Sequence, residues 1–149
     1  MKDNTIETLQ DLMKINNDRI RGYKKASENL QQGQEHLKTL FKDLEEQSAA
    51  NNVQIRDELE KLGGDLEAST TTGGKLFRTW MDLKDAFGVD SAGSVLESCE
   101  RGEDAAKNAY QSALSSGNLT DSITNVIKQQ SAKQLEAHNK IKQLRDQQQ

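Results

Sequence analysis

The residues of this chain that could do chemistry form a polar layer across four amphipathic helical patterns. Each pattern repeats apolar residues at steps of three and four, and each loses them near its midpoint. The positions where a plain bundle would place Leu or Ile hold Asn16, Ser48, Glu103 and Gln134. Di-metal carboxylate proteins built as helix bundles keep their metal ligands at this height. The pattern therefore suggests a metal site, and the number of available ligands tests that hypothesis.

The layer lacks most of the ligands that a di-iron bundle requires. Such a site takes a Glu from each of two helices and a Glu-x-x-His from each of the other two. The chain contains no Glu-x-x-His and only two histidines. We expect His36 to be solvated at the start of the second pattern, whereas His138 lies one turn beyond Gln134. The metal-ligand candidates are therefore Glu100, Glu103 and His138. His138 with one of these carboxylates gives two protein ligands, too few for a tight site, since even an open catalytic zinc keeps three.

A hydrogen-bonded core is the preferred interpretation of these residues. Neutral amides are poor ligands for iron or manganese, but they join buried networks that fix how helices align. Glu103 would be costly to bury alone, so it needs His138, Tyr23, Tyr110 or an amide as its partner. We predict no catalytic residue and no cofactor, with an iron, manganese or zinc ion as the alternative. The predicted layer consists of Asn16, Tyr23, Ser48, Asn51, Glu103, Gln134 and His138.

Composition limits the class of protein. The 149 residues are 30% charged, 33% hydrophobic and 4% aromatic, with no proline, as in long helices that have a narrow apolar stripe. One cysteine, Cys99, fits a reducing compartment and reads as a small core residue. The net charge is −4 without a concentrated basic face, which argues against nucleic-acid binding. No apolar run is long enough for a membrane, so we expect one soluble, cytoplasmic domain over 1–149.

Local signals set the expected helix boundaries. Asn4 and Glu7 have the spacing of a capping box at the start of the first helix. Gly63-Gly64 ends the second helix, and Thr120 caps the last one. The expected helices cover 4–29, 34–62, 91–115 and 120–146, with a short extra helix over 75–87.

Loop lengths predict the topology. Few residues separate the first two long helices, and few separate the last two, so each pair forms an antiparallel hairpin. About thirty residues separate the hairpins, enough to return the chain along the whole bundle. One long crossover between two hairpins is the ferritin-like arrangement of an all-α four-helix bundle. Within the crossover, Phe77, Trp80 and Phe87 share one side of the short helix. We expect them to pack on the bundle, the alternatives being a ligand platform or a docking face for a partner protein.

Several segments together resemble a known family. They are Asn16-Asn17-Asp18-Arg19 with Gly22-Tyr23, Ser69-Thr70-Thr71-Thr72-Gly73 with Trp80-Met81-Asp82, Ser98-Cys99-Glu100 with Gly102-Glu103-Asp104, and His138-x-Lys140-Ile141. The chain is similar over nearly its whole length to a bacterial family of ferritin-like four-helix-bundle proteins, domain of unknown function 2383. The resemblance implies the bundle fold and a ferritin-like relationship, but no established activity.

Two functions of different classes remain open from the sequence. The first is a non-catalytic ferritin-like bundle that acts through its surface or as a homo-oligomer, with a stress response suggested by family analogy alone. The second is a metal-binding or redox protein with a reduced mid-bundle site around Glu103 and His138. The sequence favours the first, because the polar layer has the position of a metal site without its ligands.

Overall fold

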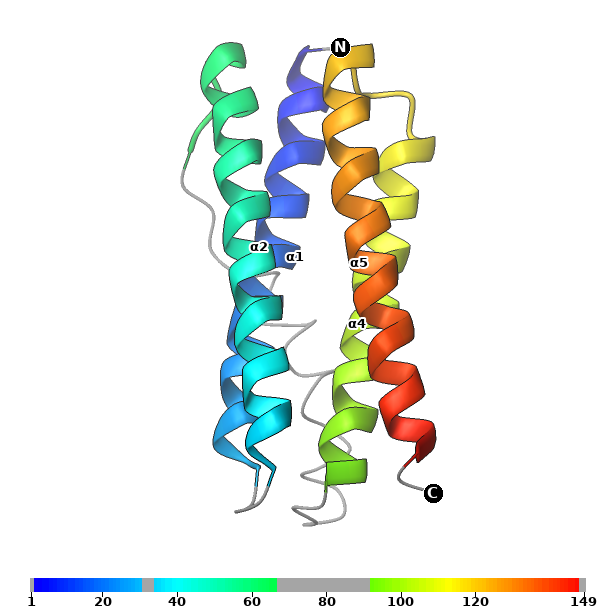
Figure 1. Ribbon diagram of the computed structural model, residues 1–149. Helices are drawn as coiled ribbons and strands as arrows, with labels where there is room; N and C mark the ends of the chain where they lie inside the picture. Colours follow the sequence, from blue (N-terminus) through cyan, green and yellow to red (C-terminus); the bar gives the residue numbers. More distant parts are fainter. Residues whose placement is uncertain (1, 31–33, 67–91, 148–149) are drawn as a thin grey trace.

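The protein is a bundle of four long α-helices. The structure, a computed structural model, describes residues 2–30, 34–66 and 92–147. Its helices are α1 (Lys2–Glu28), α2 (Glu35–Leu62), α4 (Ala92–Ser115) and α5 (Asp121–Gln147) (Figure 1). No strand occurs within these three ranges. The predicted all-α four-helix bundle is thus confirmed, and the predicted short helix over 75–87, with Phe77, Trp80 and Phe87, lies outside the described residues.

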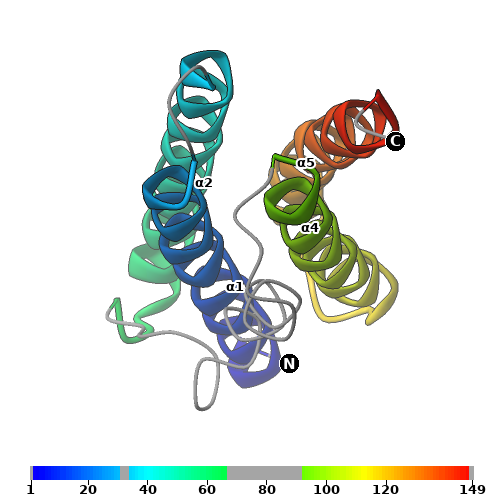
Figure 2. The ribbon, with the colours of Figure 1, turned by 90° about the horizontal axis from the view of Figure 1, so that it is seen from below.

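The helices form two antiparallel hairpins, as the loop lengths predict. In Figure 1, α1 runs downward and α2 upward, and then α4 runs upward and α5 downward. The second and third long helices therefore run parallel, which requires the connection between them to return along the bundle. Seen end-on, α1 and α4 lie next to each other at the centre, while α2 and α5 spread apart (Figure 2). The contacts between α2 and α5 are correspondingly sparse compared with those of the other neighbouring pairs.

The helix ends follow the predicted signals in two of three cases. Gly63 has φ 75°, and the Gly64 N–H donates to the Leu59 carbonyl at 2.9 Å, so these two glycines close α2. The Ile123 N–H donates to Thr120 Oγ1 at 3.4 Å, as expected of a capping threonine. The predicted cap at Asn4 is wrong, because α1 already begins at Lys2. Asp3 lies in that first turn, where a negative charge favours the positive end of the helix dipole.

Gly64 is also required for close packing. A Cβ atom at this position would lie 3.0 Å from a side-chain carbon of Ile6 and 3.2 Å from one of Leu59. The end of α2 therefore approaches the first turns of α1 so closely that a larger residue would require Ile6 and Leu59 to shift. The glycine pair both ends the helix and lets the hairpin close.

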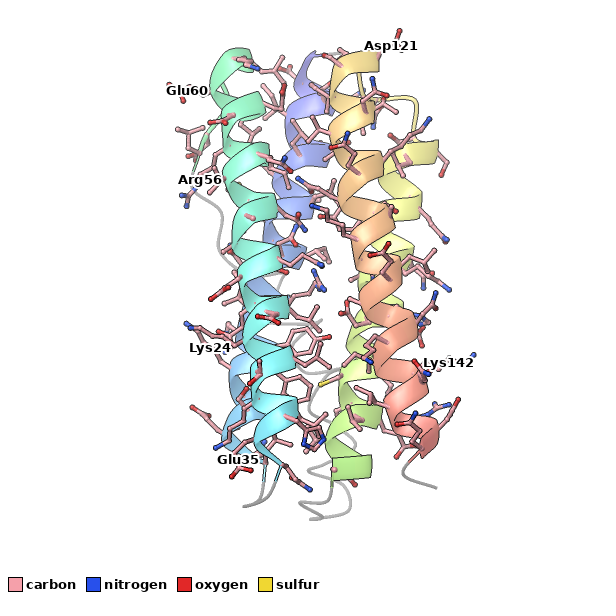
Figure 3. The ribbon with its side chains drawn as sticks, in the orientation of Figure 1. Lys24, Glu35, Arg56, Glu60, Asp121 and Lys142 are labelled. Carbon is pink, nitrogen blue, oxygen red and sulfur yellow. The ribbon has the colours of Figure 1, made fainter. Side chains whose placement is uncertain are left out.

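The hydrophobic core is divided into two clusters. Charged side chains such as Lys24, Arg56 and Lys142 point outward, while the inward faces are mostly apolar (Figure 3). Cys99 is fully buried in the first cluster, in agreement with its prediction as a small core residue. The first cluster includes Phe41, Leu44, Val95, Leu96 and Ile141, and the second includes Leu9, Leu12, Ile55, Leu59 and Ile127. Between these clusters lies the polar layer that the sequence indicates.

Within the described ranges, no helix has the length and apolar character that crossing a membrane requires.

Candidate functional site

A buried ion pair occupies the middle of the bundle. Arg19 Nη2 of α1 lies 2.8 Å from Glu103 Oε2 of α4, and both side chains have no exposed surface. The second guanidinium nitrogen, Nη1, donates to Ser48 Oγ of α2 at 2.8 Å. The carboxylate also accepts from the Tyr23 hydroxyl at 2.6 Å and from Gln134 Nε2 of α5 at 3.2 Å. All four helices therefore contribute to one charge-balanced cluster.

A second buried network lies beside this ion pair, centred on the Tyr110 hydroxyl. That hydroxyl accepts from Asn16 Nδ2 at 2.8 Å and donates to Gln130 Oε1 at 2.8 Å. Gln130 Nε2 continues the network to the Asn51 carbonyl at 3.1 Å and to Gln54 Oε1 at 2.9 Å. Asn51 Nδ2 closes it by donating to Asn16 Oδ1 at 3.2 Å. These bonds also join all four helices, so the polar layer fixes their relative heights.

Burial shifts the pKa values of the tyrosines in both networks. Burial, and then the negative charge of Glu103, holds the pKa of Tyr23 well above its usual value of 10.0. Burial raises the pKa of Tyr110 to about 12. Burial alone would lower the pKa of Arg19, but the charge of Glu103, its hydrogen bond to Arg19 and the nearby tyrosines together outweigh burial, and the pKa is raised. The tyrosines therefore stay neutral and Arg19 stays charged at every physiological pH.

This arrangement has the chemistry of a structural pair. A guanidinium has no lone pair for a metal and is not deprotonated in proteins, so it supplies a fixed positive charge. The Glu103 carboxylate already receives Arg19, Tyr23 and Gln134, which occupy three of its roughly four acceptor directions. Because a buried pair contributes little net stability but costs much when broken, its best-supported role is to specify one helix register.

His138 does not join the mid-bundle layer, although the prediction placed it there. Its Nε2 lies 2.5 Å from Asp104 Oδ1, and its Nδ1 lies 3.2 Å from Asn139 Oδ1. Of the partners expected for Glu103, Tyr23 and an amide, that of Gln134, are present, whereas His138 pairs with Asp104, the next residue along α4. Glu103 and Asp104 point to different sides of that helix, because one residue corresponds to a rotation of about 100°. The carboxylate within reach of the imidazole therefore comes from the other side of α4.

The structure brings together two of the three predicted metal-ligand candidates. Glu100 and His138 lie in one group with Asp104, and the potential ligand atoms of the three residues lie within 4.8 Å of one another. Glu103 belongs instead to the ion pair, where the positive charge of Arg19 balances the negative charge of the carboxylate. The predicted set of Glu100, Glu103 and His138 is therefore corrected to Glu100, Asp104 and His138.

The predicted layer residues are all buried, but the prediction missed their central cation. The exposed fraction is 0% for Asn16, Tyr23, Ser48, Glu103 and Gln134, 4% for Asn51 and 7% for His138. Arg19 is fully buried, although it was not among the residues predicted for the layer. One signal pointed to Arg19, since it lies three residues after Asn16 and four before Tyr23, on the same helical face. Tyr110 and Gln130 were placed inward but were not assigned to the layer.

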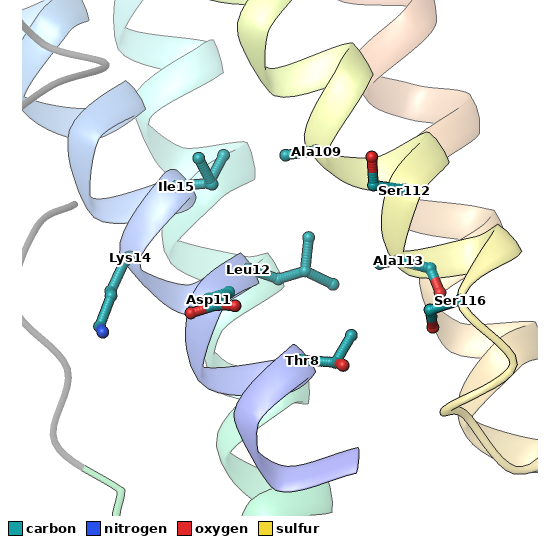
Figure 4. A pocket seen from close by; sticks show the side chains of 9 residues that line it. All are labelled: Thr8, Asp11, Leu12, Lys14, Ile15, Ala109, Ser112, Ala113 and Ser116. Atoms are coloured by element: carbon teal, nitrogen blue, oxygen red, sulfur yellow. Dashed lines mark hydrogen bonds between the residues drawn. The ribbon is translucent and has the colours of Figure 1, made fainter. Parts of the chain in front are cut away.

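A shallow groove of about 400 Å³ lies between α1 and α4. Ala109, Ser112 and Ala113 of α4 face Leu12 and Ile15 of α1 across it (Figure 4). Small residues on α4 leave this space because they cannot fill the distance between the two helices. Lys14 borders the groove but points away from it (Figure 4). Among the described residues, the charged groups that line the groove are Asp11 and Lys14, both from α1.

The fold and the polar layer together define a four-helix-bundle protein whose mid-bundle position holds an arginine–glutamate pair. The chain belongs to the family described as "Domain of unknown function (DUF2383)", which matches residues 4–116. This range includes Arg19, Ser48 and Glu103 and ends just after α4, so Gln134 and His138 lie beyond it.

One curated protein of another kind shares a partial similarity. Vimentin beta of Carassius auratus is 33% identical over 78 residues, which cover 46% of this chain and 17% of that protein. The chain thus spans less than a fifth of its length. Similarity of this extent does not place the chain in the same family.

Proposed function

We propose that this protein is a non-catalytic helical-bundle module that acts through its surface. The observation that supports the proposal is the Arg19–Glu103 pair, in which a side chain of the protein supplies the positive charge at the mid-bundle position. A bundle enzyme of the di-metal class needs its carboxylates free for metal ions at that position. Here the carboxylate is held by three internal donors and its charge is balanced by Arg19, which favours a structural role for the layer.

The alternative is a metal or redox centre around Glu103 and His138. It receives less support from the geometry, because Glu103 is bound to Arg19 and His138 is bound to Asp104. A mid-bundle metal would have to displace the guanidinium and leave it buried without its counter-ion, which is strongly unfavourable.

Partner binding would use the surface of the bundle. The exposed large apolar side chains of the described residues include Val53 of α2 and Leu135 of α5, which are 59% and 42% exposed. Both come from the helices that spread apart in Figure 2. A homo-oligomer is one form that such an interaction could take. A bacterial, cytoplasmic setting, a ferritin-like ancestry and a link to the stress response belong to the same proposal and rest on family analogy.

Metal analysis and an iron oxidation assay test the non-catalytic role. Protein purified without chelator is measured for iron and manganese by mass spectrometry, and then for its rate of Fe²⁺ oxidation in air. We expect far less than one iron or manganese per chain and a rate equal to that of buffer. One or more tightly bound iron ions with accelerated oxidation would overturn the proposal.

Light scattering after size exclusion tests the surface role. The mass of the wild-type protein is compared with the single-chain mass of 16.6 kDa and with that of a Val53→Ser/Leu135→Ser variant. We expect the wild type to exceed the single-chain mass and the variant to approach it. A wild-type protein of single-chain mass would contradict the homo-oligomer and restrict the surface role to other proteins.

A further inference from the structure

We propose that Glu100, Asp104 and His138 form a binding site for one Zn²⁺ ion at the edge of the bundle, between α4 and α5. The site is separate from the mid-bundle layer, whose carboxylate, Glu103, points to another side of α4. Nothing in the proposed non-catalytic function requires this site, and a bound Zn²⁺ ion is itself redox-inactive.

The spacing of the three residues matches a metal site built on two helices. Glu100 and Asp104 are four residues apart on α4 and so lie on one helical face. His138 of α5 faces them, and one candidate ligand atom from each residue lies within 4.8 Å of the other two. Tetrahedral Zn²⁺ with bonds of about 2.0–2.1 Å requires its ligand atoms to be roughly 3.3 Å apart. Modest side-chain rotations are therefore enough to close the three ligands around an ion.

The imidazole of His138 is placed so that one of its ring nitrogens can bind a cation. Both ring nitrogens face oxygen atoms, Nε2 facing Asp104 Oδ1 at 2.5 Å and Nδ1 facing Asn139 Oδ1 at 3.2 Å. A neutral imidazole carries one N–H and can satisfy only one of these acceptors. With the proton on Nδ1 donated to Asn139, Nε2 presents its lone pair toward two carboxylates. A divalent ion between these groups satisfies all of them, and the Nδ1–H bond then orients the ring as in many zinc sites.

Arg145 is the competing cation in this cluster. Its Nη1 forms an ion pair with Glu100 Oε2, an oxygen that is buried and receives no hydrogen bond of regular geometry. Arg145 has a second partner, Asp146, whose Oδ1 accepts from Nη2 at 2.7 Å. The arginine can therefore stay paired with Asp146 when Glu100 turns to the metal.

The site is accessible to an ion from solvent. The Asp104 side chain is 52% exposed, whereas the His138 side chain is 9% exposed. The packing of α4 on α5 thus holds Glu100 and His138 in place, and Asp104 completes the site from the surface. Three protein ligands with solvent in the fourth position form an open tetrahedral site. One imidazole with two carboxylates suits Zn²⁺ among the common divalent ions, because calcium and magnesium prefer oxygen ligands alone.

Calorimetry with ZnCl₂ on chelator-treated full-length protein tests the proposal. We expect one Zn²⁺ per chain with a micromolar or lower dissociation constant, and a rise in melting temperature with added Zn²⁺. Asp104→Asn and His138→Gln should each weaken binding at least tenfold. Arg145→Gln should strengthen it several-fold by removing the competing charge. His36→Gln is the matched control, since His36 is exposed and should leave the affinity unchanged.

Each outcome bears on the proposal. Asp104→Asn changes a half-exposed side chain, so it stays informative if His138→Gln does not fold, which circular dichroism shows. Millimolar binding, or binding that neither variant weakens, would show adventitious surface binding and overturn the site. Such a failure would leave the non-catalytic proposal intact. That proposal is tested by the iron and manganese content and by the rate of iron oxidation, not by zinc binding.

Discussion

Glu103 and Asp104 are neighbours in the sequence, yet they belong to opposite kinds of polar site. Glu103 has no exposed surface and is held by Arg19, Tyr23 and Gln134 in a closed cluster. The Asp104 side chain is half exposed and meets His138 at the edge of the bundle, where solvent can enter. The comparison shows that position in the bundle, rather than residue type, decides what a carboxylate can do. In the centre of the bundle, the charge of the carboxylate is balanced by an internal cation. At the edge, the carboxylate is accessible to an ion from solvent.

The largest expected effect comes from opening the closed cluster. Arg19→Met removes the guanidinium but keeps much of the side-chain volume, so Glu103 is left buried without its counter-ion. We expect a loss of about 3–5 kcal/mol in the free energy of unfolding, measured by urea denaturation. Lys24→Met on the exposed face of the same helix is the control and should change stability by less than about 0.5 kcal/mol. A loss below about 1 kcal/mol for Arg19→Met would mean that the cluster is not closed as described.

The next effect is a loss of stability at alkaline pH, which also depends on the closed layer. The pKa of Tyr110 is about 12 in the folded protein and 10.0 unperturbed, so folding favours the neutral phenol. The stabilisation is complete below pH 10 and is lost as the pH rises toward 12, at about 1.4 kcal/mol per pH unit. Tyr23, whose pKa is also raised, adds to the same trend.

Urea denaturation at several pH values between 9 and 12 measures this effect. Tyr110→Phe has no phenol to ionise at that position, so its stability should fall less steeply over the same range. Equal slopes for the wild type and the variant would contradict the role of Tyr110, whereas a flat wild-type profile would contradict burial of both phenols.

The smallest effect is expected at the open site. Asp104→Asn, measured in the presence of chelator, removes a charge that is half exposed and screened by solvent. Polar contacts of a carboxylate that is half exposed contribute about 0–1 kcal/mol, so the free energy of unfolding should fall by less than about 1 kcal/mol. A loss as large as that of Arg19→Met would erase the difference between the two sites, because it would make the edge cluster as essential to folding as the centre.

The helical pattern located the polar layer but did not reveal its composition. Asn16, Ser48, Glu103 and Gln134 interrupt apolar repeats, and all four are fully buried. The helical pattern did not identify Arg19 as a buried residue, because a charged residue is normally assigned to the solvated face of a helix. Burial of a carboxylate implies a cation, but the sequence does not indicate which basic residue lies opposite Glu103, 84 positions away.

The same limit applies to His138. The helical pattern placed it on the inward side of the last helix, which is correct for its burial. The pattern could not distinguish Glu103 from Asp104 as its partner, because the choice depends on how α4 is rotated against α5. That rotation is set by apolar contacts along the whole helix pair.

The sequence by itself determined the elements whose causes are local. Apolar spacing and glycine turns defined the helices, and connection lengths defined two hairpins with parallel middle helices. The interrupted repeats gave the height of the polar layer. Only the tertiary structure decided which charges meet, since Arg19 reaches Glu103 and His138 reaches Asp104 across helix interfaces. The physical reason is that burial and ion pairing depend on the rotation and approach of whole helices, which no local spacing specifies.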